Sequence, residues 1–74
     1  MIARIVIWNV FESKTTLDEL REKRPALAEG DVWISNDAQD RFGLINFADD
    51  PPDLTQVHDL IGGDPVVAEE FDVE

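Results

Sequence analysis

Residues 2–10 limit the fold of this chain more than any other segment, because they are apolar at almost every position. The segment IARIVIWNV is rich in β-branched and aromatic residues, which is typical of a β-strand. Side chains alternate between the faces of a strand, so even-numbered residues from Ile2 to Val10 share one face and odd-numbered residues from Ala3 to Phe11 share the other. Both faces are mainly apolar. We therefore expect a central strand in a sheet that is covered on both sides.

A β-hairpin is predicted in the middle of the chain. Residues 32–36 and 41–47 are two apolar runs, and the polar residues 37–40 between them have the composition of a turn. Gly43 lies inside the second run. A glycine there marks a bulge or the close approach of another group, here a tryptophan side chain or a ligand, and structural packing is the favoured explanation.

The first helix is predicted from a capping box. Thr16 is followed three residues later by Glu19, so that the hydroxyl accepts a hydrogen bond from an early backbone N–H and the carboxylate reaches back to the cap. Because the residue before a proline disfavours helical backbone, we expect the regular helix to end near Arg24, with a further turn through Ala28.

The second helix is predicted over residues 54–61. Asp53 is the expected N-cap, and Gly62-Gly63 ends the helix, with one of the two glycines suited to the left-handed conformation that commonly follows a helix. A last strand over residues 66–73 alternates apolar and acidic residues, as an edge strand does.

The predicted order is β-α-β-β-α-β in one domain, residues 1–74. Two helices can cover only one face of a four-stranded sheet. Because the first strand is apolar on both faces, we expect a second copy of the chain to cover the other face as a homodimer.

The formal net charge of the chain is -11, and this charge is uneven. All six bases lie in residues 1–42, whereas residues 43–74 hold nine acids and no base. Such a surface repels nucleic acids and anionic membranes, so neither is an expected partner. The favoured explanation is that the acids keep the protein soluble; the alternatives are a mimic of DNA and a docking surface for a basic partner. With no cysteine, no long apolar run and no signal-peptide pattern, we expect a cytoplasmic protein without disulfides.

Two tryptophans and two asparagines on the predicted strands are candidates for a ligand site. Trp8 and Trp33 are expected to lie close together, either as core or interface packing or as the wall of an aromatic pocket. Asn9 and Asn46 are polar residues on apolar strands, and each would orient a small polar ligand or fix a loop.

The remaining candidates are single charged or titratable residues. His58 is the only histidine and lies on the second predicted helix, where an ordinary exposed position is the favoured explanation. Arg4 and Arg41 each pair with a carboxylate or bind an anionic group, and pairing is favoured. We expect no metal site and no cofactor, because the chain lacks the spacing of zinc, calcium and phosphate-binding motifs.

The chain resembles the small monooxygenase-type proteins of the dimeric α/β-barrel superfamily. The resemblance rests on Trp33 in the second strand, on the RFGL segment at residues 41–44 with Phe47 and Asp49 after it, and on the acidic strand at residues 66–73. It implies an α+β, ferredoxin-like βαββαβ fold with a four-stranded antiparallel sheet and two helices on one face. It also implies a homodimer whose sheets face each other and a pocket between the sheet and the helices.

Some proteins of this superfamily oxidise aromatic compounds without a cofactor, and others degrade haem. No complete catalytic set matches this chain, so the catalytic residues are not predicted; Trp8, Asn9 and Trp33 are put forward as ligand-binding residues, with His58 as weak support for haem chemistry. The helical regions are shorter than those of typical members, which predicts a small or filled pocket. The leading hypothesis is a protein that binds or oxidises a small aromatic ligand. Two alternatives are an acidic interaction module that docks on a basic partner and a regulatory domain that binds amino acids at a dimer interface.

Overall fold

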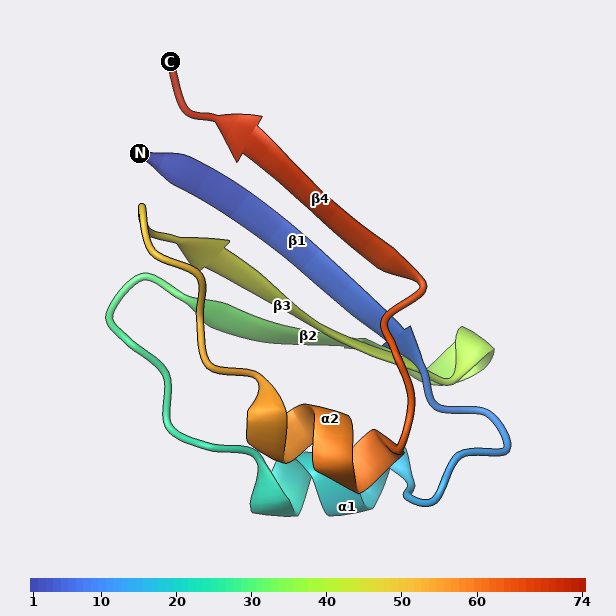
Figure 1. Ribbon diagram of the computed structural model, residues 1–74. Coiled ribbons are helices and arrows are strands. Elements are labelled where there is room, and N and C mark those ends of the chain that lie inside the picture. The colour runs from blue at the N-terminus through green and yellow to red at the C-terminus, as the bar shows by residue number, and fades with distance from the viewer.

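The computed structural model describes all residues from 1 to 74 and has the βαββαβ order (Figure 1). The elements are β1 (Ile2–Asn9), α1 (Leu17–Lys23), β2 (Val32–Asn36), a 3₁₀ turn η1 (Asp37–Gln39), β3 (Arg41–Phe47), α2 (Thr55–Ile61) and β4 (Val67–Asp72). The hairpin strands have the bounds that the sequence predicts, and the first and last strands are slightly shorter than predicted.

The four strands form one antiparallel sheet in the order β2-β3-β1-β4. β1 is central, as predicted: Val6 pairs with Leu44 of β3 on one side and with Ala68 of β4 on the other. Both helices lie on the same side of the sheet (Figure 1). The fold is therefore α+β and ferredoxin-like, with an open sheet.

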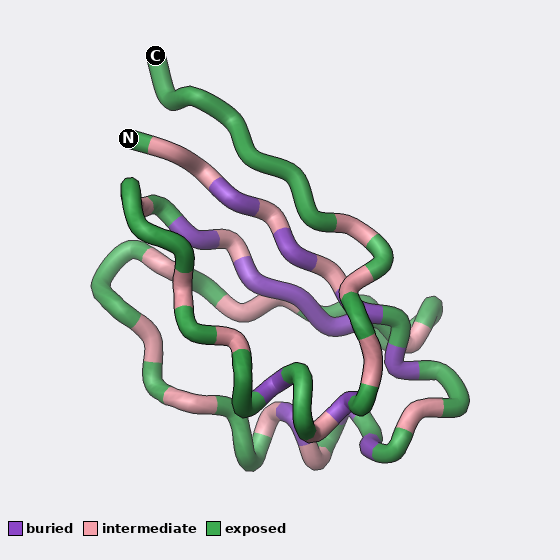
Figure 2. The backbone as a smooth tube through the Cα atoms, in the orientation of Figure 1, coloured by how far each residue is buried: buried purple, intermediate pink, exposed green.

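The hydrophobic core lies between the two helices and the sheet face that they cover. Its largest fully buried side chains come from the two central strands, from both helices and from the residue after β1, namely Trp8, Phe42, Leu44, Leu20, Val57 and Val10. Figure 2 shows that buried positions are concentrated in β1 and β3, whereas β4 is largely exposed. Neither helix has the length and apolar composition needed to cross a membrane.

The first helix begins as predicted and ends sooner. The Thr16 hydroxyl accepts a hydrogen bond from the Glu19 N–H at 3.2 Å, but the Glu19 carboxylate accepts from the Thr15 hydroxyl at 2.8 Å instead of reaching the cap backbone. The further turn through Ala28 is wrong: α1 ends at Lys23, and Arg24 has extended backbone with ψ of 144° because Pro25 follows it.

The second helix begins at Thr55, one residue later than predicted. Asp53 still accepts a hydrogen bond from the first turn of the helix, because the Thr55 N–H donates to Oδ1 of Asp53 at 3.0 Å. Of the two glycines that were expected to end the helix, Gly62 has the left-handed conformation, with φ of 81°, and its N–H donates to the His58 carbonyl at 2.7 Å.

Gly43 serves close packing within the sheet, and its neighbours are not the tryptophans. A Cβ at this position would lie 2.5 Å from the backbone oxygen of Val6 and 3.2 Å from side-chain atoms of Ile34 and Ile7. Because a backbone oxygen cannot move aside as a side-chain tip can, only glycine fits here without shifting the sheet.

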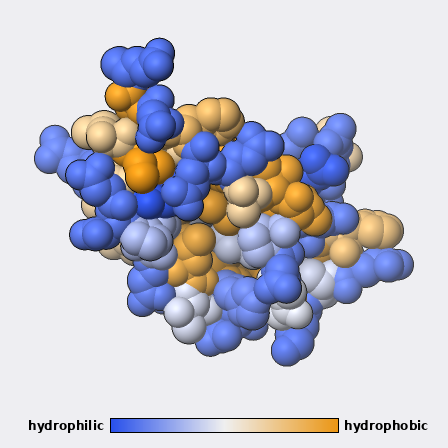
Figure 3. Space-filling model, turned by 45° about the horizontal axis from the view of Figure 1, so that its top comes forward, coloured by the Kyte–Doolittle hydropathy of each residue, from blue (hydrophilic) through white to orange (hydrophobic).

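The sheet face turned away from the helices is uncovered; we call it the open face. It presents eight large apolar side chains, Ile5, Ile7, Val32, Ile34, Ile45, Phe47, Val67 and Phe71. Three of them are markedly exposed: Val32 at 47%, Phe47 at 42% and Phe71 at 49%. Apolar side chains also reach the part of the surface seen in Figure 3, where hydrophilic ones surround them.

Candidate functional site

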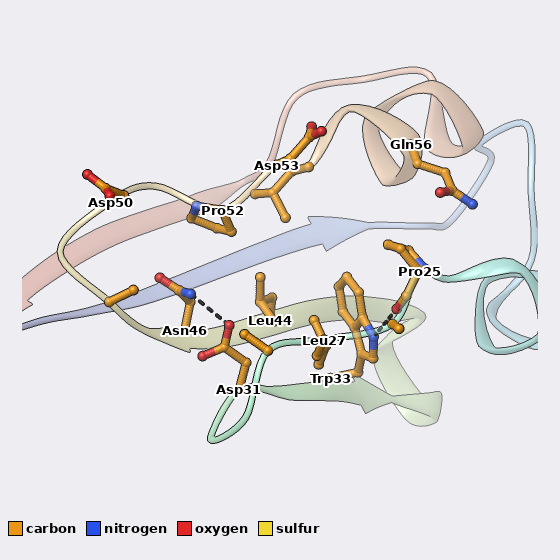
Figure 4. Close-up of a pocket in the computed structure, with 14 residues that line it drawn as sticks. Pro25, Leu27, Asp31, Trp33, Leu44, Asn46, Asp50, Pro52, Asp53 and Gln56 are labelled. Atoms are coloured by element: carbon orange, nitrogen blue, oxygen red, sulfur yellow. Dashed lines mark hydrogen bonds between the residues drawn. The ribbon is translucent and has the colours of Figure 1, made fainter.

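A cleft of about 420 Å³ lies between the covered face of the sheet and two loops, residues 24–31 and 48–54. β2 and β3 form one wall, and the loop before α2 together with the start of that helix forms the opposite wall (Figure 4). The loop that follows α1 closes the third side. The cleft thus lies on the face of the sheet that the helices cover, but loops enclose it more than helices do, since Gln56 is the one helical residue of its lining.

Trp33 provides the aromatic wall of the cleft. Its ring stacks on Phe42 with the ring centroids 5.2 Å apart, and its Nε1–H donates a hydrogen bond to the Pro25 carbonyl at 3.2 Å (Figure 4). These two contacts fix the orientation of the indole ring. Leu44 continues the apolar wall on the next strand, and Leu54 contributes from the facing loop.

Asn46 and Asp31 form the polar end of the cleft. Nδ2 of Asn46 donates to Oδ2 of Asp31 at 2.8 Å (Figure 4), while Oδ1 of Asn46 accepts from Nη1 of Arg4 at 3.2 Å. The other oxygen of Asp31 accepts from the Phe47 N–H at 3.0 Å. These hydrogen bonds fix which side of the Asn46 amide carries the oxygen and which carries the nitrogen. They leave the second N–H of Asn46 without a protein acceptor, although the side chain is buried.

Arg4 lies behind this polar end and holds the loop that follows β3. Its guanidinium donates to the carbonyl oxygens of Ala48 at 2.8 Å, Asp49 at 3.0 Å and Asp50 at 3.1 Å. The nearest carboxylate, that of Glu70, is 3.7 Å from Nε. Arg4 is therefore a structural cation buried beneath the cleft, not a group that is free to bind an anionic ligand.

The lining of the cleft is acidic. It includes the carboxylates of Asp31, Asp50 and Asp53 and no basic side chain. Hydrogen bonds from the backbone N–H and the hydroxyl of Thr55 lower the pKa of Asp53, which keeps this carboxylate ionised at neutral pH. The cleft therefore favours neutral or cationic ligands over anionic ones.

The four sequence-predicted site residues do not come together. Trp33 lines the cleft, but Trp8 is 1% exposed in the core and makes no hydrogen bond through Nε1. Asn9 lies on the open face, where its Oδ1 accepts from the Phe11 N–H at 3.2 Å. His58 is exposed on α2, with Nε2 3.2 Å from Oδ1 of Asp64.

The alternation of side chains along β1 explains this separation. Trp8 and Asn9 are consecutive in the strand, so they point to opposite faces. The covered face carries Trp8, which pairs with Phe42, and Phe42 in turn stacks on Trp33. The two tryptophans thus belong to one aromatic layer and do not form two walls of a pocket.

Several lining residues escaped the sequence interpretation, among them Asp31, Leu27, Pro52, Leu54 and Gln56. They lie on loops or at the start of α2, and they meet the sheet only through tertiary packing. Gln56 also joins the two helical segments, since Nε2 donates to the Lys23 carbonyl at 2.8 Å. No group of three or more His, Cys, Asp or Glu residues is arranged to hold a metal ion.

Comparison with models of known protein families gives no match, and no curated protein matches the chain in sequence. The resemblance to the dimeric α/β-barrel superfamily thus stands at the level of the ferredoxin-like fold, which strand order and connections establish.

Proposed function

We propose that this domain binds a small, flat, largely apolar molecule, neutral or cationic, in the cleft beside Trp33. The observation that carries the proposal is the fixed Trp33 ring, which forms an apolar wall that ends at a buried amide with a free N–H. Ligand sites typically combine such walls with a few polar groups that set orientation.

The size of the cleft supports a ligand of one or two rings. Its volume of about 420 Å³ lies at the lower end of the range of about 300–1,000 Å³ that is common for small-molecule sites. The aromatic ring of the ligand would stack against Trp33, and a polar atom would accept from Nδ2 of Asn46. A cationic substituent would lie near the Asp53 carboxylate.

Oxidation of an aromatic ligand, as in some proteins that the chain resembles, would take place in the same cleft. The neighbours of that ligand would be Trp33 and Asn46, and Trp8 and Asn9 would not contact it. The acids of residues 43–74 are divided among the loop before α2, α2 itself, the turn that follows it, β4 and Glu74 after that strand. No single element gathers them, so binding of a small ligand is favoured over docking of a basic protein.

Three indole probes that differ in charge test the proposal: indole, tryptamine and indole-3-acetate. We expect saturable amide shifts at residues 44–46 and 52–56 in two-dimensional NMR spectra, with tryptamine binding most tightly and indole-3-acetate at least tenfold more weakly than tryptamine. The order follows from the carboxylates of the lining.

Two tryptophan substitutions provide a matched control. Ala28→Trp places a large side chain on the rim of the cleft and should abolish the shifts, whereas Ala38→Trp makes the same change at an exposed position on η1 and should leave them unchanged. Equal binding of all three probes by the wild type, or unaltered binding by Ala28→Trp, would refute the proposal.

A further inference from the structure

We propose that the open face carries a second binding site, which takes a small monocarboxylate whose apolar body has the size of a single ring. The site is a hollow of about 240 Å³ at the end of the face where β2 leads into η1 and β3 begins. Its lining includes Ile7 of β1, Ile34 and Asn36 of β2, Gln39 of η1, and Arg41 and Gly43 of β3. The cleft lies on the opposite face of the sheet, so this inference is independent of the ligand proposed there.

Gly43 and two isoleucines form the apolar part of the hollow. Gly43 pairs with Ile7 of one neighbouring strand and with Ile34 of the other, so the two isoleucines flank a position that has no side chain. Side-chain atoms of both lie 3.2 Å from the place where a Cβ of Gly43 would stand. The apolar body of a ligand can therefore lie over the glycine backbone, with an isoleucine on either side.

Arg41 supplies the only charge in the lining of the hollow. Its side chain is exposed, and its guanidinium forms neither an ion pair nor a hydrogen bond within a chain that has 17 acids. The nearby carboxylate of Asp37 is engaged by Arg21 instead. Because a guanidinium can bind both oxygens of a carboxylate through parallel N–H groups, Arg41 is available for an acid from outside the chain.

Two amide side chains beside Arg41 add neutral donors. Oδ1 of Asn36 accepts from the backbone N–H of Gln39 at 3.2 Å, so Nδ2 is the group of Asn36 that is left for a ligand. The side-chain amide of Gln39 makes no hydrogen bond within the chain. Together with the guanidinium, these amides can satisfy more than one lone pair of a bound carboxylate.

The lining of the hollow also limits the class of acid. A free amino acid would bring an ammonium group, which Arg41 repels and for which the lining holds no carboxylate. The cations that suit the cleft are disfavoured here for the same reason. The volume is below the range of about 300–1,000 Å³ that is common for small-molecule sites, so one ring fits better than two. These properties together favour a one-ring acid without a second charged group.

Titration with four probes, followed by two-dimensional NMR, tests the proposal: phenylacetate, phenylacetamide, acetate and phenylalanine. With phenylacetate we expect saturable shifts of the amides of Ile7, Ile34 and Gly43 and of the Nε–H of Arg41. Phenylacetamide lacks the charge, acetate lacks the ring, and phenylalanine adds an ammonium group. Each of these three should bind more weakly than phenylacetate by a factor of about ten or more. Residues 52–56, at the cleft, should not shift with phenylacetate.

Two arginine substitutions provide the matched control. Arg41→Gln removes the guanidinium from the hollow and should weaken phenylacetate binding by a factor of about ten or more. Arg24→Gln removes the same charge from an exposed side chain outside the hollow and should leave the binding unchanged. Both variants change the net charge equally, so general repulsion cannot explain a difference between them. Amide dispersion in the spectra shows that each variant is folded.

Several results would overturn the proposal. If phenylacetate and phenylacetamide bind equally, or if Arg41→Gln binds phenylacetate as the wild type does, Arg41 does not hold the carboxylate. Phenylacetate shifts at residues 52–56 with none at the hollow would place the acid in the cleft. Shifts at the hollow that arise on concentrating the protein, and that no probe alters, would show that a side chain of a second copy fills it.

Discussion

Replacement of Arg4 should destabilise the protein far more than replacement of an exposed arginine. Arg4 is 6% exposed, and its guanidinium makes four hydrogen bonds, one to Asn46 and three to the carbonyl oxygens of residues 48–50. Arg4→Met keeps an unbranched side chain as far as the position of Nε but removes the guanidinium and all four of its hydrogen bonds. The acceptors are then left partly buried without partners, and the Asn46 amide at the end of the cleft loses its restraint.

The expected cost is a large part of the total stability. Loss of one member of a buried, hydrogen-bonded charged network typically costs about 3–5 kcal/mol. At roughly 0.05–0.15 kcal/mol per residue, a domain of 74 residues has a free energy of unfolding of about 4–11 kcal/mol. With a urea dependence near 1 kcal/mol per molar, the unfolding midpoint should fall by about 3 M or more.

Urea unfolding followed by circular dichroism, at one fixed protein concentration, measures this change. Arg24→Met is the matched control, because it removes the same charge from an exposed side chain that makes no hydrogen bond, and its free energy of unfolding should change by less than about 0.5 kcal/mol. Amide exchange should also accelerate in residues 48–54 of Arg4→Met. If Arg4→Met unfolds within about 1 kcal/mol of the wild type, or if exchange in this loop is unchanged, Arg4 does not hold the cleft as described.

Two further predictions concern stability. Gly43→Ala should lower the free energy of unfolding by about 1–3 kcal/mol, because its Cβ would lie 2.5 Å from the Val6 carbonyl oxygen, whereas Gly63→Ala meets no atom within 4 Å and should be nearly neutral in the same urea assay. Glu19 accepts a hydrogen bond from Lys23, which lowers the pKa of the Glu19 carboxyl below its ordinary value of 4.5. The resulting stability is present above the unfolded-state pKa and is lost as pH falls through the folded-state pKa, so the advantage of the wild type over Glu19→Gln should shrink between about pH 6 and pH 3. A constant difference over that range, or a Gly63→Ala variant as unstable as Gly43→Ala, would contradict these two predictions.

The sheet could be predicted from sequence because its strands carry strong local signals. The apolar residues on both faces of residues 2–10 identify the central strand, and the polar turn between two apolar runs gives the hairpin with its correct bounds. Thr16 and Gly62 mark helix ends through local backbone chemistry that tertiary contacts do not change. The further turn through Ala28 failed because the conformational restriction imposed by Pro25 outweighs the helix propensity of the residues that follow it.

The cleft could be predicted only in part. Trp33 and Asn46 attract attention as an aromatic and a polar residue on apolar strands, and both line the cleft. Asp31 reaches Asn46 only because β2 and β3 pair in one particular register, and no local pattern connects these two residues. Leu54 reaches the cleft because Arg4 holds the preceding loop by bonds to backbone carbonyls, which every residue type possesses. Hydrogen bonds to backbone carbonyls cannot be recognised from the amino-acid composition of the loop.

The most direct test of ligand binding in the cleft is an isotope-filtered NOE experiment on the complex with tryptamine. It distinguishes the cleft from the open face, where an apolar probe could also adhere. The structure predicts NOEs from the indole protons of the probe to the methyl groups of Leu44 and Leu54, and none to those of Ile5 and Ile7. NOEs to Ile5 and Ile7 without any to Leu44 would show that the probe binds the open face, and the proposed function would then be wrong.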